Sequence, residues 1–175
     1  MGSGTQMPNA IKTYVHYVDK VNKFVGKFAM YLIFAMVGIL LYSSISKTFF
    51  HPALWTLEMA QFTMVSYYLL GGGYSIQMGS HVRMDLVYSR WSELTQARVD
   101  TVTTTFLIFF LILLMYGGIS STVYAIEYGE ESRSIWAPKM APVKIIMDIG
   151  IFLTLLQAIS SFFKNLAIAT GRDIT

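Results

Sequence analysis

A few ionisable side chains beside or inside long uncharged runs are the residues of this sequence that could carry chemistry. Glu58 follows Pro52 by six residues, so a helix that begins at Pro52 would place Glu58 about 9 Å along its axis. Asp148 follows Lys144 by four residues, the spacing of an ion pair on one helix face. Burying an unpaired charge is costly, so such residues face protein or water. We expect Asp148 to pair with Lys144, and Glu58 to make a buried contact with a partner protein, with a proton relay as the alternative.

Other reactive arrangements are absent from the sequence. The histidines His16, His51 and His81 lie in three different segments outside the uncharged runs, so they cannot form a haem pair or a metal site of helical spacing. There is no cysteine, which excludes disulfides and thiolate metal sites. The glycines at 71–73 lack the lysine of a phosphate-binding loop, and no serine has a nucleophile-elbow context. We therefore expect no enzyme activity, no cofactor and no metal, and an apolar chain with a net charge of only +3 argues against nucleic-acid binding.

Four long runs with almost no charge, the last of them interrupted at Asp148, determine the expected architecture. The 175 residues are 54% hydrophobic and 13% charged, whereas soluble domains carry roughly 25% charged residues. About 20 apolar residues suffice for a helix to cross the hydrocarbon core of a membrane. We predict an all-α integral membrane protein with four transmembrane helices in one domain of residues 28–166, with spans at about residues 28–46, 55–79, 101–126 and 145–163.

The segments that flank these spans are more polar. Residues 1–6 look like a cloning remnant. In residues 7–27, apolar side chains recur at helical spacing while lysines fall on the other side, which predicts an amphipathic helix lying on the lipid surface. Residues 80–100 mix apolar and charged side chains and are too polar to span a membrane, so we predict a short interfacial helix between the second and third spans. Residues 167–175 are expected to form a cytoplasmic tail.

The distribution of basic residues predicts the orientation of the chain in the membrane. The four spans place nine lysines and arginines on the side of the N-terminus and four on the opposite side. Because cytoplasmic segments are enriched in these residues, both termini are expected in the cytoplasm. The acidic residues Glu127, Glu130 and Glu131 then lie on the outer side, between the third and fourth spans.

Small residues four apart predict close contacts between the spans. Apolar helices gain no hydrophobic driving force from association in lipid, and small residues let their backbones approach closely. The last three spans each carry such a ladder, namely Gly71, Ser75 and Gly79; Gly117, Ser121 and Ala125; and Gly150, Thr154 and Ala158. We therefore expect a compact bundle, a tight interface with a partner, or both.

Three stretches of the sequence carry a family resemblance. Trp55 and Glu58 open the second span, the segment HVRMD closes it, and the run EESRSIWAPKMAPVK follows the third span. Together they resemble the small membrane subunit, of the DctQ type, of tripartite ATP-independent periplasmic (TRAP) transporters, over about residues 25–166. Members often carry two adjacent acidic residues after the tryptophan, where this chain has Leu57 and then Glu58. The candidate residues for a partner interface or a structural contact are Trp55, Glu58, His81, Arg83, Asp85, Glu131, Ser132, Trp136, Pro138, Pro142, Lys144 and Asp148.

The resemblance implies a role in transport without catalysis. In such importers a soluble periplasmic protein captures an organic anion, such as a dicarboxylate. A large multi-span permease coupled to sodium then moves the anion across the bacterial inner membrane. In this family the small subunit would support the scaffold of the permease within the membrane lipids. Trp136 would either anchor the binding protein or lie in an interfacial aromatic belt.

Two other functions stay open from the sequence. A self-contained four-helix proton-coupled antiporter would use Glu58 as its titrating residue, and it would need a second charge deep in the membrane. A cofactor-free accessory subunit of another membrane complex would show the same packing ladders. The presence or absence of transport by the isolated chain would distinguish the antiporter from the two subunit functions.

Overall fold

The computed structural model describes residues 9–78 and 92–170, and these residues are mostly helical. The helices are α1 (Asn9–Phe49), α2 (Thr56–Gln77), α4 (Glu93–Glu127) and α5 (Ala141–Ala169). The described part of the chain contains no strand, only an isolated bridge between Glu131 and Lys139. The predicted all-α fold is therefore confirmed.

Three of these helices are long and apolar enough to cross a membrane. They contain the stretches Ile11–Phe49, Arg98–Glu127 and Ala141–Ala169, which include the predicted first, third and fourth spans. α2 has 22 residues, and at 1.5 Å per residue this length is enough to cross a hydrocarbon core of roughly 30 Å. It is not one of the three, because polar side chains and three consecutive glycines are spread along its length. The second span therefore stays a prediction.

The N-terminal amphipathic segment differs from its prediction. Residues 9–49 form one continuous helix, without a break between a surface helix and a first span. Val15 and Val18 of the apolar stripe are buried. The hydroxyl of Tyr14 donates a hydrogen bond to the Leu156 carbonyl of α5 at 3.2 Å. The stripe that predicted contact with lipid thus packs against the protein itself, and α1 continues through the predicted boundary.

The predicted interfacial helix between the second and third spans is described only in its last part. Residues 93–100 form the first turns of α4, which continues to Glu127, so this part is not a separate helix. Residues 80–91 lie outside the described residues. The predicted tail likewise begins inside α5, which ends at Ala169.

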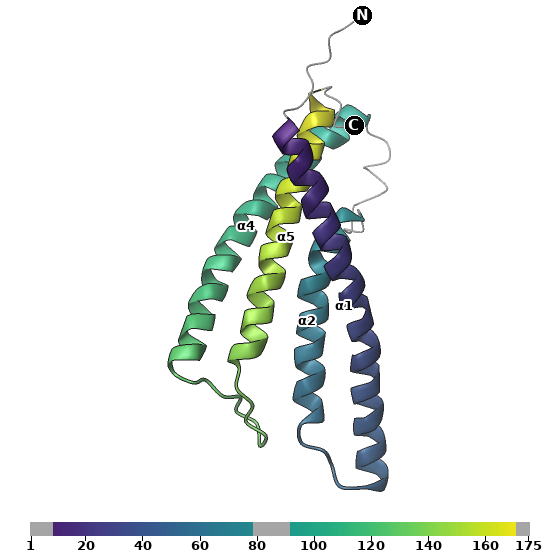
Figure 1. Ribbon diagram of the computed structural model, residues 1–175, viewed down its shortest axis with the longest axis vertical. Coiled ribbons are helices and arrows are strands. Elements are labelled where there is room, and N and C mark those ends of the chain that lie inside the picture. Colours follow the sequence, from purple (N-terminus) through teal and green to yellow (C-terminus); the bar gives the residue numbers. More distant parts are fainter. Residues whose placement is uncertain (1–8, 79–91, 171–175) are drawn as a thin grey trace, which may run out of the picture.

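The four helices form a row rather than a closed bundle (Figure 1). α1 packs on α2, α2 on α5, and α5 on α4, while α1 also crosses α5. The hairpins α1–α2 and α4–α5 meet near the start of α1 and the end of α5, and they diverge towards their loops (Figure 1). Leu111, Ile151 and Ala158 form a buried apolar cluster between α4 and α5. This arrangement is more open than a compact bundle, the first of the two outcomes expected from the small-residue ladders, and the tight interface with a partner stays a prediction.

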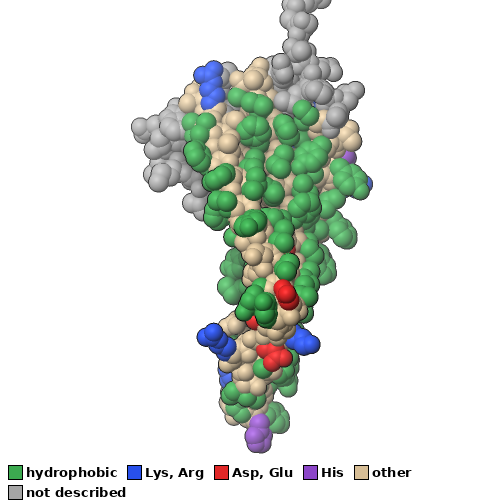
Figure 2. All heavy atoms as spheres, turned by 90° about the vertical axis from the view of Figure 1, so that its left-hand side faces the viewer, with side chains coloured by type: hydrophobic (Ala, Val, Ile, Leu, Met, Phe, Trp, Pro, Cys, Tyr) green, Lys and Arg blue, Asp and Glu red, His purple; other side chains and the backbone are tan. Residues whose placement is uncertain are grey.

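Large apolar side chains cover the outer sides of the helices. Phe34 of α1 and Phe106 of α4 are exposed, and Tyr116 of α4 is 79% exposed. Figure 2, which looks onto the α4 side of Figure 1, shows hydrophobic side chains over most of this face. Soluble monomers rarely expose contiguous apolar patches larger than a few hundred Å². The composition and the exposed apolar helices together indicate a membrane protein.

Candidate functional site

Most of the candidate residues that the structure describes lie around the loop that joins α4 to α5, residues 128–140, called here the α4–α5 loop. Trp55 and Glu58 lie at the start of α2, and Lys144 and Asp148 lie near the start of α5. Within the described residues, no group of three or more histidine and acidic side chains could hold a metal ion. The candidates His81, Arg83 and Asp85 lie outside the described residues.

The α4–α5 loop is closed by backbone hydrogen bonds. The Ser132 amide donates to the Pro138 carbonyl, and the Met140 amide donates to the Glu130 carbonyl, both at 2.9 Å. These bonds flank the isolated bridge described above and resemble a short antiparallel ladder. Pro142 then occupies one of the first positions of α5, where its missing amide removes no helical bond. The two hydrogen-bonded sides of the loop, residues 130–132 and 138–140, hold the residues between them in a defined position.

The tip of this loop is apolar, and its backbone has little freedom. Ile135 is 85% exposed and Trp136 is 41% exposed. Ala137 has a φ of 44°, in a region that residues other than glycine rarely adopt. Its amide donates to the Ser134 hydroxyl at 3.1 Å, and the ring of Pro138 restricts the next φ. The tip therefore presents two apolar side chains from a restricted backbone.

Glu58 connects α2 to the α4–α5 loop. The residue is 7% exposed, and one carboxylate oxygen accepts a hydrogen bond from the Ser132 hydroxyl at 2.5 Å. The other oxygen is buried and has no hydrogen-bond partner within the described residues. The buried contact of Glu58 that the structure shows is thus made with its own chain, and the contact with a partner protein stays a prediction.

Glu58 also lies nearer the helix end than its distance from Pro52 predicts. α2 begins at Thr56, so Glu58 is in the first turn and not about 9 Å along the helix. In this position the carboxylate is favoured by the positive end of the helix dipole. A place at the helix end is less suited to a proton relay through the membrane than the deeper one that the sequence indicated.

Two contacts at the start of α2 explain this shift. The Thr56 hydroxyl lies 2.9 Å from both the Ala53 carbonyl and the Ser43 hydroxyl of α1. The ring of Trp55 stacks on that of Tyr42 in α1, with 5.7 Å between the ring centroids. The first contact favours a turn before Thr56, and the second places Trp55 within the α1–α2 hairpin. Trp55 therefore has a structural contact in this chain.

Lys144 and Asp148 do not form the predicted ion pair. The Lys144 ammonium pairs with Glu130 of the α4–α5 loop at 2.5 Å and lies 3.4 Å from the Ser121 carbonyl. Asp148 instead accepts a hydrogen bond from the Thr122 hydroxyl of α4 at 2.6 Å. Both side chains turn towards α4, because the neighbouring helix and loop offer partners that the spacing along α5 does not reveal. The predicted pair is therefore wrong, and Lys144 joins α5 to the loop.

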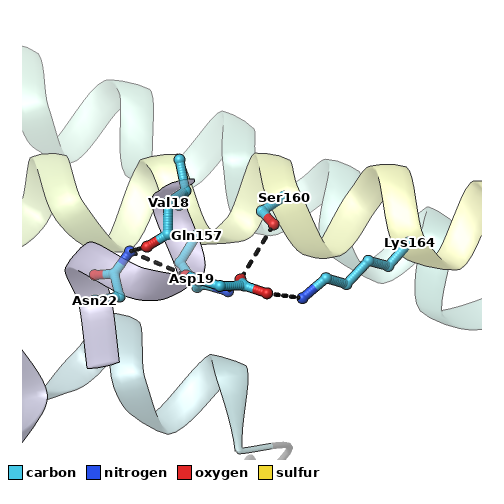
Figure 3. A network of polar contacts seen from close by, with 6 residues as sticks. All are labelled: Val18, Asp19, Asn22, Gln157, Ser160 and Lys164. Carbon is cyan, nitrogen blue, oxygen red and sulfur yellow. Dashed lines mark hydrogen bonds and ion pairs between the residues drawn. The ribbon is translucent and has the colours of Figure 1, made fainter. Parts of the chain in front are cut away.

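A second polar cluster, absent from the candidate residues, joins α1 to α5 (Figure 3). The Asp19 carboxylate pairs with Lys164 at 2.5 Å and accepts hydrogen bonds from Gln157 at 2.8 Å and from Ser160 at 3.4 Å. Asn22 donates to the side-chain oxygen of Gln157 at 2.9 Å. Asn22, Gln157 and Ser160 are fully buried. The spacing of Gln157, Ser160 and Lys164 by three and four residues, which puts them on one face, was the signal available in the sequence.

Close helix contacts occur at small residues, though not at all of those predicted. Gly150 of α5 lies against the backbone of Leu69 in α2, with no room for a Cβ, as its ladder predicts. In α4 the close contact is made by Gly118 and not by Gly117, which faces open space. Gly71 of α2 also faces open space. The ladders thus identify helices that make close contacts, but they do not always identify the residue that makes the contact.

Comparison with known protein families identifies the family to which the chain belongs. A family model described as tripartite ATP-independent periplasmic transporters, DctQ component, matches residues 36–167. The chain belongs to the DctQ family. The match covers about three quarters of the sequence and includes α2, α4, nearly all of α5 and the C-terminal part of α1. No curated protein and no solved structure matches the chain.

Membership of the DctQ family confirms the resemblance seen in the sequence and makes the chain a component of a transporter. The matched region includes the Glu58–Ser132 hydrogen bond and the Lys144–Glu130 ion pair. Asp19 of the second polar cluster precedes it. The contacts around the α4–α5 loop are therefore built from the DctQ region alone.

Loss of the Glu58–Ser132 hydrogen bond is expected to destabilise this DctQ chain. Glu58→Ala leaves the Ser132 hydroxyl without its acceptor and should cost about 1 to 3 kcal/mol, whereas Glu58→Gln keeps an acceptor and should cost less. Thermal unfolding of the detergent-solubilised chain measures both effects. Ser132→Ala is the matched control, because it removes the same contact from the other side. Strictly additive effects in the double alanine variant would contradict the assigned contact.

Proposed function

We propose that this DctQ chain is the small scaffold subunit of a sodium-coupled, binding-protein-dependent importer of organic anions. One face of the helix row would pack on the large permease, which would hold the solute and sodium sites. The observation that carries the proposal is the open row with extensive apolar surface in a transporter-component family. Surface of this kind suits contact with lipid on one side and with another membrane protein on the other.

The polar contacts between the helices also support a scaffold. Asp19 of α1 pairs with Lys164 of α5, and Lys144 of α5 pairs with Glu130 of the α4–α5 loop. Each of these charges is engaged by another element of the same chain. Contacts of this kind hold the helices together, and a group engaged in them is not free to bind a solute.

Co-purification with the permease tests this function. When this chain carries an affinity tag and is co-expressed with the large permease of the same transporter, we expect the two to elute together at equal stoichiometry after detergent extraction. A tagged, unrelated membrane protein of similar size serves as the control. Separate elution of the two folded chains would argue against the scaffold function.

We further propose that α2 is a fourth span, and that both termini lie in the cytoplasm of a bacterial cell, with the protein in the inner membrane. The start of α1 and the end of α5 lie at the same end of the row (Figure 1), as an even number of spans requires. A topology reporter fused after Thr175 should therefore behave as cytoplasmic, and one inserted near Glu130 as periplasmic. A periplasmic signal from the fusion at Thr175 would overturn the orientation.

The tip of the α4–α5 loop is our candidate for contact with the soluble binding protein. Trp136→Ala should raise the concentration of binding protein needed for half-maximal uptake by about ten-fold, the effect of an ordinary aromatic hot spot. Phe50→Ala is the matched control, because Phe50 is an exposed aromatic residue of the α1–α2 hairpin. Sodium dependence should not change in either variant. Equal effects of both substitutions, or altered sodium dependence with normal docking, would contradict this role.

A further inference from the structure

Three lysines form a basic stripe on the exposed side of α1. Lys20, Lys23 and Lys27 are exposed, and their spacing of three and four residues places them on one helix face. Within the described residues their ammonium groups make no hydrogen bond or ion pair, whereas Lys144 and Lys164 each pair with a carboxylate. In the part of the chain that the structure describes, positive charge that is not paired with a carboxylate thus gathers on this side of α1, ahead of the region that the family model matches.

The same helix face becomes apolar beyond Lys27. Tyr31 and Phe34 follow at intervals of four and three residues, so they continue the stripe, and both are exposed. A groove of about 540 Å³ lies here, lined by Lys27, Met30, Tyr31, Ile33 and Phe34 of α1 and by Tyr67 of α2. A second hollow of about 500 Å³ shares Met30 and Tyr67 with this groove. The face therefore carries charge at one end and an apolar groove at the other.

The position of Lys27 along α1 indicates which end of this face would lie at the membrane surface. Lys27 is the last charged residue before the uncharged run that extends from Phe28 to Ser46. At such a boundary the ammonium group of a lysine extends to the level of the lipid phosphates, while its alkyl stem lies on apolar surface. Anionic lipids attract lysines placed there. A soluble anion would use the charge but not the groove, and an apolar partner helix would use the groove but leave the charge unpaired.

We propose that the basic stripe and the groove form a binding site for an anionic phospholipid. Its phosphate would lie at Lys27, with Lys23 one turn away, and one acyl chain would lie along Met30, Phe34 and Tyr67. The bound lipid would contact both helices of the α1–α2 hairpin. The site requires only that α1 crosses a membrane, so it does not depend on the transport function.

Lipid retention by the full chain tests the charged end of the site. The detergent-purified chain is incubated with equal amounts of phosphatidylglycerol and phosphatidylcholine of identical acyl chains, and native mass spectrometry measures the bound lipid. We expect preferential retention of phosphatidylglycerol, and a loss of about five-fold in Lys27→Gln, as for one lysine near an anionic lipid surface. Lys47→Gln is the matched control, since Lys47 is exposed near the other end of the same helix, and it should retain the lipid normally.

The groove is tested by a second variant. Met30→Trp should occupy part of the groove and lower the retention of both lipids, and circular dichroism should show unchanged helix content. Glycerol phosphate, which has the charge but no acyl chain, should not displace phosphatidylglycerol. Equal retention of the two lipids, equal losses in Lys27→Gln and Lys47→Gln, or displacement by glycerol phosphate would each overturn the proposal.

Discussion

Reconstituted alone into liposomes, the purified chain is expected to show no organic-anion uptake above that of protein-free liposomes, with or without a sodium gradient. The reason lies in the contacts of its polar groups. Asp19 is engaged by Lys164 and Gln157, and Asp148 is engaged by Thr122, each through a contact between different helices. Because these two acidic residues hold helices together, the open row offers little from which to build a solute path. Addition of the permease and the binding protein to the same liposomes should produce sodium-dependent uptake.

Uptake of a radiolabelled dicarboxylate measures this difference directly. Sodium-driven uptake by the chain alone would contradict the scaffold proposal, and proton-coupled exchange by the chain alone would favour the antiporter. The two functions also differ at Glu58. In an antiporter Glu58→Gln should abolish exchange, because an amide cannot release a proton. In a scaffold subunit the same variant should assemble and support uptake, because the amide oxygen still accepts the hydrogen bond from Ser132.

The helices themselves could be predicted from the sequence, because the signals for them are local. The predicted spans at residues 101–126 and 145–163 lie inside α4 and α5. Apolar composition over about 20 residues is enough to identify such helices. The same signal did not locate the boundary of a surface helix in residues 7–27. An amphipathic stripe looks the same in the sequence whether it faces lipid or, as at Val18, the protein.

The partners of the ionisable residues could not be predicted, because they come from distant parts of the chain. Glu58 bonds to a serine 74 residues further on, and Asp19 pairs with a lysine 145 residues further on. Spacing rules on a helix cover only neighbours three or four residues apart. Even Lys144, which has Asp148 at that spacing, pairs with Glu130 of the loop. The sequence thus identified several residues with buried contacts, while the identity of each contact required the fold.

The small residues of the ladders show the same limit of sequence analysis. An experiment can separate those that contact another helix from those that do not. Small residues four apart indicate a helix face, but they do not show which face meets a neighbour. Gly117 belongs to a predicted ladder and faces open space, whereas Gly150 belongs to another and lies against the backbone of Leu69. From the sequence alone, these two glycines are equivalent candidates. In the structure, only one of them has no room for a side chain.

Gly150→Ala is therefore expected to lower the melting temperature of the detergent-solubilised chain by about 3 to 10 °C, the range for an overpacking cost of about 1 to 3 kcal/mol. The atoms that a Cβ at Gly150 would meet include the backbone carbonyl of Leu69. A backbone group cannot rotate away, so α2 and α5 would have to separate. Gly117→Ala is the matched control, because it makes the same substitution inside a helix with open space around it. Alanine favours the helix by up to about 1 kcal/mol over glycine, so this control should unfold at an unchanged or slightly higher temperature. Equal shifts in the two variants would mean that α2 and α5 do not meet at Gly150, and the order of helices in the row would have to be revised.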